Sequence, residues 1–191
     1  MPLVPPTRTD QTGLVFLQYY AGHKVYHPGI DFNWGPLRNS DLGQPVVAPA
    51  SGSIVYVSPR GTNGGLGNYV VLYHPAFRAW TRYLHLEEVA VRAGQQVKQG
   101  QMLGLLGDEG TTSAHLHFEV LNEKGFNWIR DWRRPYGRYP EGLPKAAVAS
   151  MWLDPVRWLR ENTERSPEPT SAAGRAALDR AAKRRAKRIG R

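Results

Sequence analysis

The sequence predicts a mostly β fold, in which short antiparallel strands form strongly curved sheets. Between Val15 and about Val120, short apolar runs alternate with glycines, which is typical of strands joined by turns. The 20 glycines and 15 prolines favour the same interpretation, because both residue types are common in turns and weaken long helices. A chain of 191 residues can form one domain with a buried core and additional tails.

Four apolar segments carry the strand prediction, at residues 46–47, 53–57, 69–73 and 116–120. They contain many of the β-branched and aromatic residues that suit a pleated, half-buried surface. Glycines separate these segments and mark the expected turns, at Gly35, Gly43, Gly52, Gly61, Gly64, Gly65 and Gly67.

Changes in composition divide the chain into three parts. Residues 1–13 are polar and proline-rich and are expected to form an N-terminal arm, whereas residues 14–164 are expected to form the folded domain. Within that domain, residues 122–151 combine aromatic residues with arginines and prolines, so we expect an insertion that forms a long structured loop. Asp154 and Pro155 suit the N-cap and the first position of a short C-terminal helix.

The third part, residues 165–191, is expected to be a linker followed by a basic tail, either helical or disordered. Residues 166–191 hold eight Lys or Arg and two acidic residues, so they carry +6 of the formal net charge of +9. Such a charge implies an anionic partner, either nucleic acid or a cell envelope with phosphate and carboxylate groups. The charge alone does not choose between them.

The absence of cysteine excludes a disulfide framework, a thiolate metal site and a cysteine nucleophile. A metal would therefore need nitrogen or oxygen ligands, and histidine with carboxylate suits zinc. Residues 1–13 lack the charged and apolar regions of a signal peptide, and no apolar run approaches the roughly 20 residues of a membrane span. We expect a soluble protein that stays inside the cell, leaves the cell by a route that needs no signal peptide, or was expressed without its leader.

The histidines provide the first indication of chemistry. His115 and His117 are two residues apart on an expected strand, so their imidazoles point to the same side and one could bind a metal beside the other. His27 precedes Asp31 by four residues, and Gly29 allows the backbone between them to turn tightly. One His, one Asp and a second His would give a three-ligand site of the kind that holds catalytic zinc.

In this context the sequence resembles peptidase family M23, the lysostaphin-like (LytM-type) peptidoglycan endopeptidases. The resemblance runs from about Tyr26 to Val120, and the helix expected at Asp154 is similar to the family's usual end. The matching residues occur in order: His27-x-Gly29-Ile30-Asp31, Gly43-x-Pro45-Val46-x-Ala48, Gly52-x-Ile54-Val55, Gly67-Asn68-Tyr69-Val70, His74, Tyr83-Leu84-His85-Leu86, Gly94-x-x-Val97-x-x-Gly100-Gln101, Gly104-x-x-Gly107 and His115-Leu116-His117-Phe118-Glu119.

The resemblance implies the lysostaphin-like fold (LytM type, duplicated hybrid motif), a Zn²⁺ cofactor and a set of site residues. By it, His27, Asp31 and His117 are the zinc ligands, and His85 and His115 are the catalytic histidines. A histidine would then do the proton transfer for which other zinc peptidases use the glutamate of an HExxH motif, which is absent here. The segment before the histidine pair departs from many relatives, because Ala114 stands where they have proline.

Several further residues keep alternative interpretations. His74 is expected to be structural or to support the site indirectly, and His23 to be exposed. Tyr20 or Tyr26 could reach the oxyanion of the reaction, but aromatic packing is an equal alternative. The aromatic residues of the 122–151 insertion could wall a substrate groove or pack on the domain itself.

The sequence therefore predicts a zinc endopeptidase that hydrolyses stem or cross-bridge peptides of peptidoglycan. The missing signal peptide and the basic tail suggest a phage-type endolysin, with a secreted bacterial enzyme without its leader as the alternative. The main alternative is a catalytically inactive scaffold of the same family that binds peptidoglycan or activates another wall hydrolase. A third alternative, specific nucleic-acid binding, ranks last because no such motif is present. We expect a monomer that acts in the periplasm or extracellular wall, with a basic tail that binds anionic envelope polymers or lipopolysaccharide.

Overall fold

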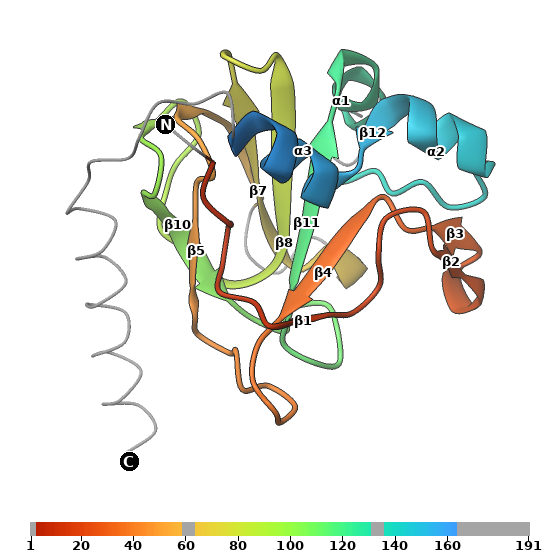
Figure 1. Cartoon of the computed structure of the whole chain (residues 1–191), viewed down its shortest axis with the longest axis horizontal. Coiled ribbons are helices and arrows are strands. Elements are labelled where there is room, and N and C mark those ends of the chain that lie inside the picture. Colours follow the sequence, from red (N-terminus) through yellow and green to blue (C-terminus); the bar gives the residue numbers. More distant parts are fainter. Residues whose placement is uncertain (1–2, 59–63, 131–135, 164–191) are drawn as a thin grey trace.

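The computed structural model describes residues 3–58, 64–130 and 136–163, and in this part of the chain it confirms the predicted mostly β fold (Figure 1). The main sheet has the order β1-β4-β11-β8-β7-β6-β9, and β10 joins it by pairing with both β8 and β5. Strand β12 pairs with β11, and β2 pairs with β3 in a separate small sheet. Every strand pair in the described ranges is antiparallel.

The elements are short, as the many glycines and prolines predict, and β8 is the longest strand described. The strands are β1 (Gln11–Thr12), β2 (Tyr19–Tyr20), β3 (Val25–Tyr26), β4 (Gly29–Asn33), β5 (Pro45–Val47), β6 (Gly52–Val57), β7 (Asn68–His74), β8 (Ala79–Val89), β9 (Gln96–Val97), β10 (Met102–Leu106), β11 (Leu116–Leu121) and β12 (Trp152–Leu153). The helices are α1 (Glu123–Ile129), α2 (Lys145–Met151) and α3 (Pro155–Thr163), with short 3-10 helices at Ala21–His23 and Gly64–Leu66.

The main hydrophobic core lies on one face of the central strands. Phe118 of β11 is directly opposite Ile30 of β4 and Tyr83 of β8, and all three side chains are buried in this core. Trp158 of α3 packs into the same cluster. Because strand side chains alternate between faces, the residues between these apolar ones point to the opposite face of the sheet, where the candidate site lies.

Helices α1 and α2 contact each other and close one end of that second face (Figure 1). Their buried residues Ile129 and Val148 form a second apolar cluster with Leu121 of β11 and Trp152 of β12. Packing on one apolar face is what stabilises helices as short as these, since isolated helices of this length are marginal in water.

The expectation of a long structured loop at residues 122–151 is wrong for both ends of that segment, which form α1 and α2. Asn122 caps α1 because its side-chain oxygen accepts a hydrogen bond from the Gly125 backbone N–H at 3.0 Å. Residues 136–144 connect back to α2 and pass close to the candidate site. The intervening residues 131–135, which include Trp132, lie outside the described ranges.

The N-terminal segment, expected to be an arm, runs along the domain from Leu3 onwards. Leu3 is buried in the main core, and the Val47 backbone N–H donates to the Pro6 carbonyl at 2.7 Å. The segment then forms β1, which pairs with β4.

The predicted C-terminal helix is confirmed as α3. The Asp154 carboxylate accepts hydrogen bonds from the backbone N–H groups of Val156 and Arg157 at 3.0 and 3.1 Å, as an N-cap residue does. None of the described helices is both long and apolar enough to cross a membrane. The basic tail expected at 165–191 lies outside the described residues.

Candidate metal centre

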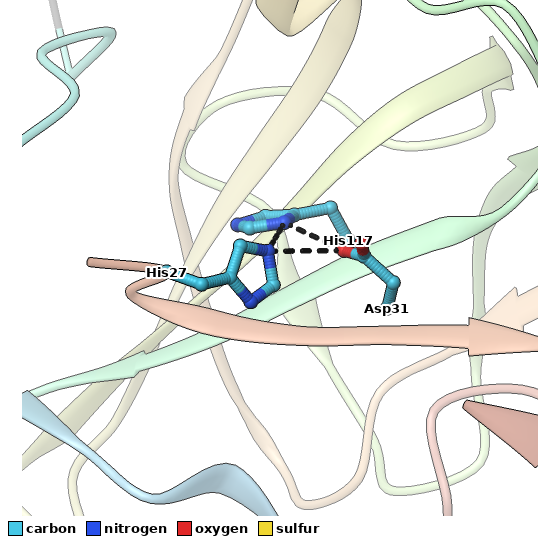
Figure 2. A group of neighbouring side chains, drawn as sticks. All are labelled: His27, Asp31 and His117. Carbon is cyan, nitrogen blue, oxygen red and sulfur yellow. Dashed lines mark hydrogen bonds and ion pairs between the residues drawn. The ribbon is translucent and has the colours of Figure 1, made fainter. Parts of the chain in front are cut away.

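Two neighbouring strands bring Asp31 and His117 together. In the antiparallel register of β4 and β11, Asp31 is directly opposite His117, and Gly29 is directly opposite Glu119. His27 lies just before β4 and points back toward the same place (Figure 2). The structure therefore gathers the three residues that the sequence resemblance implied as metal ligands.

The three donor atoms form a compact triangle on the buried face of the sheet. His27 Nε2 lies 2.9 Å from His117 Nδ1 and 3.2 Å from Asp31 Oδ1, and His117 Nδ1 lies 2.9 Å from Asp31 Oδ1 (Figure 2). Donor atoms bound tetrahedrally at about 2.1 Å from zinc stand about 3.4 Å apart. A small outward movement of each side chain would admit the ion, so the residues present fit a metal with nitrogen and oxygen ligands.

The charges in this cluster are strongly coupled. Burial opposes ionisation of Asp31, yet hydrogen bonds with His117 and His27 hold the pKa of its carboxyl well below the ordinary value. Burial also opposes charge on His117, but its hydrogen bonds to Asp31 and Glu119 outweigh this and raise its pKa to about 9. Burial, and then the neighbouring His117 charge, lowers the pKa of His27. A metal cation would take the place of the proton that these groups share.

His117 is held from its far side by a buried carboxylate. Its Nε2–H donates to Glu119 Oε1 at 2.9 Å, so Nδ1 is the nitrogen that faces His27 and Asp31 and would bind a metal in place of its proton. This is the second hydrogen bond that metal-binding histidines usually make. His27 differs, because its Nδ1 is buried without a hydrogen-bond partner among the described residues.

Two further histidines stand beside the triangle in matching orientations. His85 Nδ1–H donates to the Glu109 carbonyl at 3.0 Å, and His115 Nδ1–H donates to the Ser113 carbonyl at 2.9 Å. A carbonyl can only accept, so each neutral ring keeps its lone pair on Nε2. The two ring centroids are 4.6 Å apart, and His115 Nε2 lies 3.9 Å from Asp31 Oδ1. The histidines predicted to be catalytic therefore lie together at the site.

An irregularity in β8 turns His85 toward this cluster. The pairing of β8 with β7 shifts register between Asn68 and Val70, and His85 has a left-handed backbone with φ of +65°. That conformation is strained for residues other than glycine, and such strain is commonly found at functional sites. Burial, and then the nearby His115 and His117, lowers the pKa of His85 to about 3, so the ring is neutral at neutral pH.

Glycines leave room at two places around the site. A Cβ on Gly29 would lie 2.3 Å from the Phe118 carbonyl oxygen and 3.0 Å from Glu119 Cγ, so only glycine lets β4 approach β11 this closely. Gly67 has φ of +60°, and a Cβ there would lie 2.0 Å from the Glu109 carbonyl oxygen that accepts from His85. Both glycines belong to the motifs that carry the family resemblance.

The structure adds three residues that the sequence did not single out as functional. Glu119 and Arg82 form a buried ion pair behind His117, and Tyr139 of the segment 136–144 has its ring centroid 6.0 Å from that of His117. Burial, and then the charges of Glu119 and Asp31, raises the pKa of Tyr139 well above its ordinary value, so its phenol stays protonated. The one available signal was Glu119, which follows His117 at the spacing that puts both on one face.

The remaining candidates lie elsewhere or pack on the domain. His74 is fully buried at the end of β7, where Nε2 lies 2.8 Å from Thr81 Oγ1, which agrees with the structural interpretation. His23 is exposed beside Tyr20, at 4.9 Å between ring centroids. Tyr26 packs against Tyr19 in the small β2–β3 sheet, with ring centroids 5.0 Å apart.

The described aromatic residues of the 122–151 insertion also pack on the domain. Phe126 stacks on Trp80 of β8 at 4.4 Å between ring centroids, and Tyr136 stacks on Phe126 at 5.6 Å. Trp128 meets Trp152 edge to face at 5.5 Å. Of the two sequence interpretations, packing on the domain describes these three residues, whereas Tyr139 lies beside the metal ligands.

Fold and donor set together define a β domain with a mononuclear site of the type that holds a metal through histidine and carboxylate. The chain belongs to peptidase family M23, whose family description matches residues 25–128, just over half of its length. The matched range contains all five residues that the resemblance implied for the site.

The relatives include proteins named as peptidoglycan endopeptidases and proteins named as murein hydrolase activators. The chain is 40% identical to the peptidoglycan DD-endopeptidase ShyB of Vibrio cholerae over 102 residues, which cover 53% of this chain and 22% of ShyB. It is 37% identical to the murein hydrolase activator NlpD of Salmonella typhimurium over 78 residues, which cover 41% of this chain and 20% of NlpD. The chain thus matches only about a fifth of the length of these curated relatives.

Among solved structures, the fold is similar to the catalytic domain of the antimicrobial peptidase lysostaphin from Staphylococcus simulans. The TM-score is 0.55 at 26% identity, and the match covers 78% of this chain and 92% of that domain. This similarity confirms the lysostaphin-like fold that the resemblance implied.

Proposed function

We propose that the chain is a zinc-dependent endopeptidase that hydrolyses peptide bonds in peptidoglycan. The observation that supports this proposal is the convergence of two sets of side chains on one place. His27, Asp31 and His117 offer three metal-ligand atoms about 3 Å apart, and His85 and His115 stand beside them with Nδ1 bound to backbone carbonyls, so that Nε2 is the nitrogen left for chemistry. The endopeptidase named among the relatives supplies the substrate class.

Zinc in such a site acts as a Lewis acid that polarises the scissile carbonyl and makes water acidic enough to lose a proton near neutral pH. The chain's own residues would handle that proton. Nε2 of His115 or His85 can accept it, and the resulting imidazolium can return it to the leaving amine. The Glu109 and Ser113 carbonyls keep both rings in the tautomer that this transfer needs.

The second candidate function is activation of another wall hydrolase, because one group of relatives is named for that role. An activator needs a docking surface but no set of convergent metal ligands and proton carriers. This chain retains that set in full at the expected positions, which favours the enzyme.

Digestion of defined cross-linked muropeptides, followed by mass spectrometry, separates the two functions. We expect the zinc-loaded chain to convert peptide-linked dimers into two fragments whose masses sum to the dimer plus one water. Intact dimers, together with faster digestion of whole sacculi by an added wall amidase, would support the activator instead. Arg157→Met, which removes only an exposed ion pair on α3, is a suitable control variant.

We also retain the division of the chain expected from its sequence, with residues 14–164 as the peptidase domain and residues 165–191 as a separate linker and tail. The family match at residues 25–128 lies within the proposed domain. The net charge of +6 in residues 166–191 supports binding of the tail to anionic envelope polymers or lipopolysaccharide. The phage-type origin stays a prediction, which the neighbouring genes would test.

A further inference from the structure

Arg82 is a fully buried charged residue that the proposed chemistry does not use. It lies on β8 directly opposite Glu119 of β11, on the same sheet face as the metal ligands. Its guanidinium makes four hydrogen bonds to residues in the described part of the chain. Nε and Nη2 donate to the two oxygens of Glu119 at 2.9 and 2.7 Å, and Nη1 donates to the backbone carbonyls of Tyr136 and Arg138 at 2.9 and 3.1 Å.

The two hydrogen bonds from Arg82 to Glu119 connect Arg82 to the metal centre. Arg82 binds the Glu119 carboxylate in a bidentate way, and the Trp152 indole N–H adds a third hydrogen bond to Oε2 at 2.8 Å. Glu119 Oε1 is thereby fixed where it accepts the Nε2–H of His117. The ring of His117 can then present only Nδ1 to a metal.

The two hydrogen bonds from Arg82 Nη1 connect Arg82 to the 136–144 segment. Both carbonyls that accept from Arg82 Nη1 flank Gly137, where a Cβ would lie 2.7 Å from the Tyr69 hydroxyl, so the backbone is pressed against the sheet at this point. Tyr139 follows directly, and its ring lies beside His117. One guanidinium therefore contacts both the carboxylate behind the metal ligand and the segment in front of it.

We propose that Arg82 is a positioning residue that couples the metal centre to the 136–144 segment, holding His117 through Glu119 and Tyr139 through the Tyr136 and Arg138 carbonyls. This inference rests on the proposed function, since it assumes that His117 binds zinc. It implies that zinc binding and the order of the 136–144 segment affect each other. Loss of the Arg82 contacts weakens zinc binding and loosens the segment, and zinc binding in turn makes the segment more ordered.

The role requires arginine rather than any cation. A planar guanidinium offers five N–H donors in a fixed fork, which allows two bonds to a carboxylate and two to carbonyls on another side. A lysine ammonium would keep the positive charge beside Glu119 but could not satisfy both partners in this geometry. Arg82→Lys therefore separates charge neutralisation from positioning.

The test compares zinc affinity and segment order in the full-length chain. The variants are Arg82→Met, Arg82→Lys and the double variant Arg82→Met/Glu119→Gln, which removes the unpaired buried carboxylate that Arg82→Met alone would leave. Arg157→Met is the matched control, because it also breaks an arginine–glutamate pair, on the exposed surface of α3. Zinc affinity is measured by chelator competition, and visible absorption of the Co²⁺ form reports ligand geometry.

Segment order is measured by hydrogen exchange of the peptide that covers residues 136–144. Its Glu141 and Leu143 amides donate to the Tyr139 and Pro140 carbonyls at 2.9 and 3.2 Å, so their exchange reports opening of this segment. The β5–β10 pair serves as the internal reference, because β10 pairs with β8 only at residues 86–89, away from Arg82.

We expect Arg82→Met and Arg82→Lys to raise the Kd for zinc by about 10–100-fold, to change the Co²⁺ spectrum and to speed exchange in the 136–144 peptide. The double variant should recover thermal stability without recovering zinc affinity. Normal affinity in Arg82→Lys, or restored affinity in the double variant, would overturn the inference, because Arg82 would then act only by neutralising Glu119. If the wild-type chain itself bound no zinc, the proposed function would fail instead.

Discussion

Asp31 of β4 and His117 of β11 are directly opposite cross-strand neighbours, and Asp31 Oδ1 lies 2.9 Å from His117 Nδ1. Two residues that lie 86 positions apart in the sequence thus meet because their strands pair in one register. A slip of one strand by one residue would turn the metal ligand on that strand into the main core. The pairing of β4 with β11 therefore sets the geometry of the metal centre. Ile30 and Phe118, which alternate with the ligands on these strands, are buried in the main core and fix that pairing.

His85 and His115 should be needed for turnover but not for zinc binding. We expect His115→Ala and His85→Asn to lower the rate of muropeptide cleavage by about 10²–10⁴-fold while zinc stays bound. Asparagine is the better replacement at position 85, because it tolerates the left-handed backbone found there. Rates are followed by chromatography and zinc by elemental analysis. Loss of zinc from either variant would show that these residues are ligands.

Gly29→Ala should damage both stability and the site. The added Cβ would meet the Phe118 carbonyl at 2.3 Å, and backbone on both strands would have to move. We expect a loss of about 1–3 kcal/mol in the free energy of unfolding, measured in urea, and weaker zinc binding. Gly65→Ala is the control, since a Cβ there would lie 3.8 Å from the Gly110 carbonyl oxygen, an ordinary contact distance. Equal stability of the two variants would contradict the close approach of β4 and β11.

His74 should make the stability of the fold depend on pH. Burial lowers its pKa from 6.5 to about 4, although its hydrogen bond to the Ser51 carbonyl opposes the shift. Between these values the unfolded chain binds a proton that the folded chain does not, so stability contributed by His74 is complete above about pH 6.5 and is lost as pH falls toward 4.

The size of this effect is about 3 kcal/mol at most, from about 1.4 kcal/mol per pH unit. Urea unfolding of the chelator-treated chain and of His74→Gln at a series of pH values measures it. The wild type should lose stability more steeply than the variant between pH 6.5 and pH 4. Parallel curves would mean that His74 is not the titrating group.

Sequence periodicity was sufficient for the strands whose apolar runs are unbroken. The predicted segments 53–57 and 69–73 correspond to β6 and β7, and the segment 116–120 to β11. Strand β8 was not predicted, because Thr81, Arg82 and His85 interrupt its apolar pattern. All three are buried through tertiary contacts that no local pattern encodes. Thr81 lies on the main-core side beside His74 and Tyr83, whereas Arg82 pairs with Glu119 on the second face of the sheet.

The candidate site could be predicted only as far as its motifs extend. His27 and Asp31 share one motif, and His115 and His117 share another, so each pair was recognisable. Arg82 and Tyr139 belong to neither, because they reach the site through strand pairing and through the path of the 136–144 segment. Helices α1 and α2 were missed for a similar reason, since packing on Leu121 and Trp152 stabilises them more than their own propensity does.

The basic tail should contribute to cell binding rather than to cleavage. A chain that ends at Asn162 should cleave soluble muropeptides at the normal rate but bind sacculi or whole cells less well, because most of the net charge is removed. The difference should shrink as salt screens the charges. Co-sedimentation at low and high ionic strength measures it. Equal binding of the two chains at low salt would remove the role proposed for the tail.

Zinc titration of the metal-free chain tests the proposed enzyme most directly. Zinc is added in steps to the chelator-treated wild type and to His117→Ala, and cleavage of a cross-linked muropeptide is followed by mass spectrometry. We expect wild-type activity to rise in proportion to added zinc and to level off at one equivalent per chain, while His117→Ala stays inactive throughout. Full cleavage by the metal-free wild type, or equal activation of His117→Ala, would contradict a catalytic zinc held by His27, Asp31 and His117.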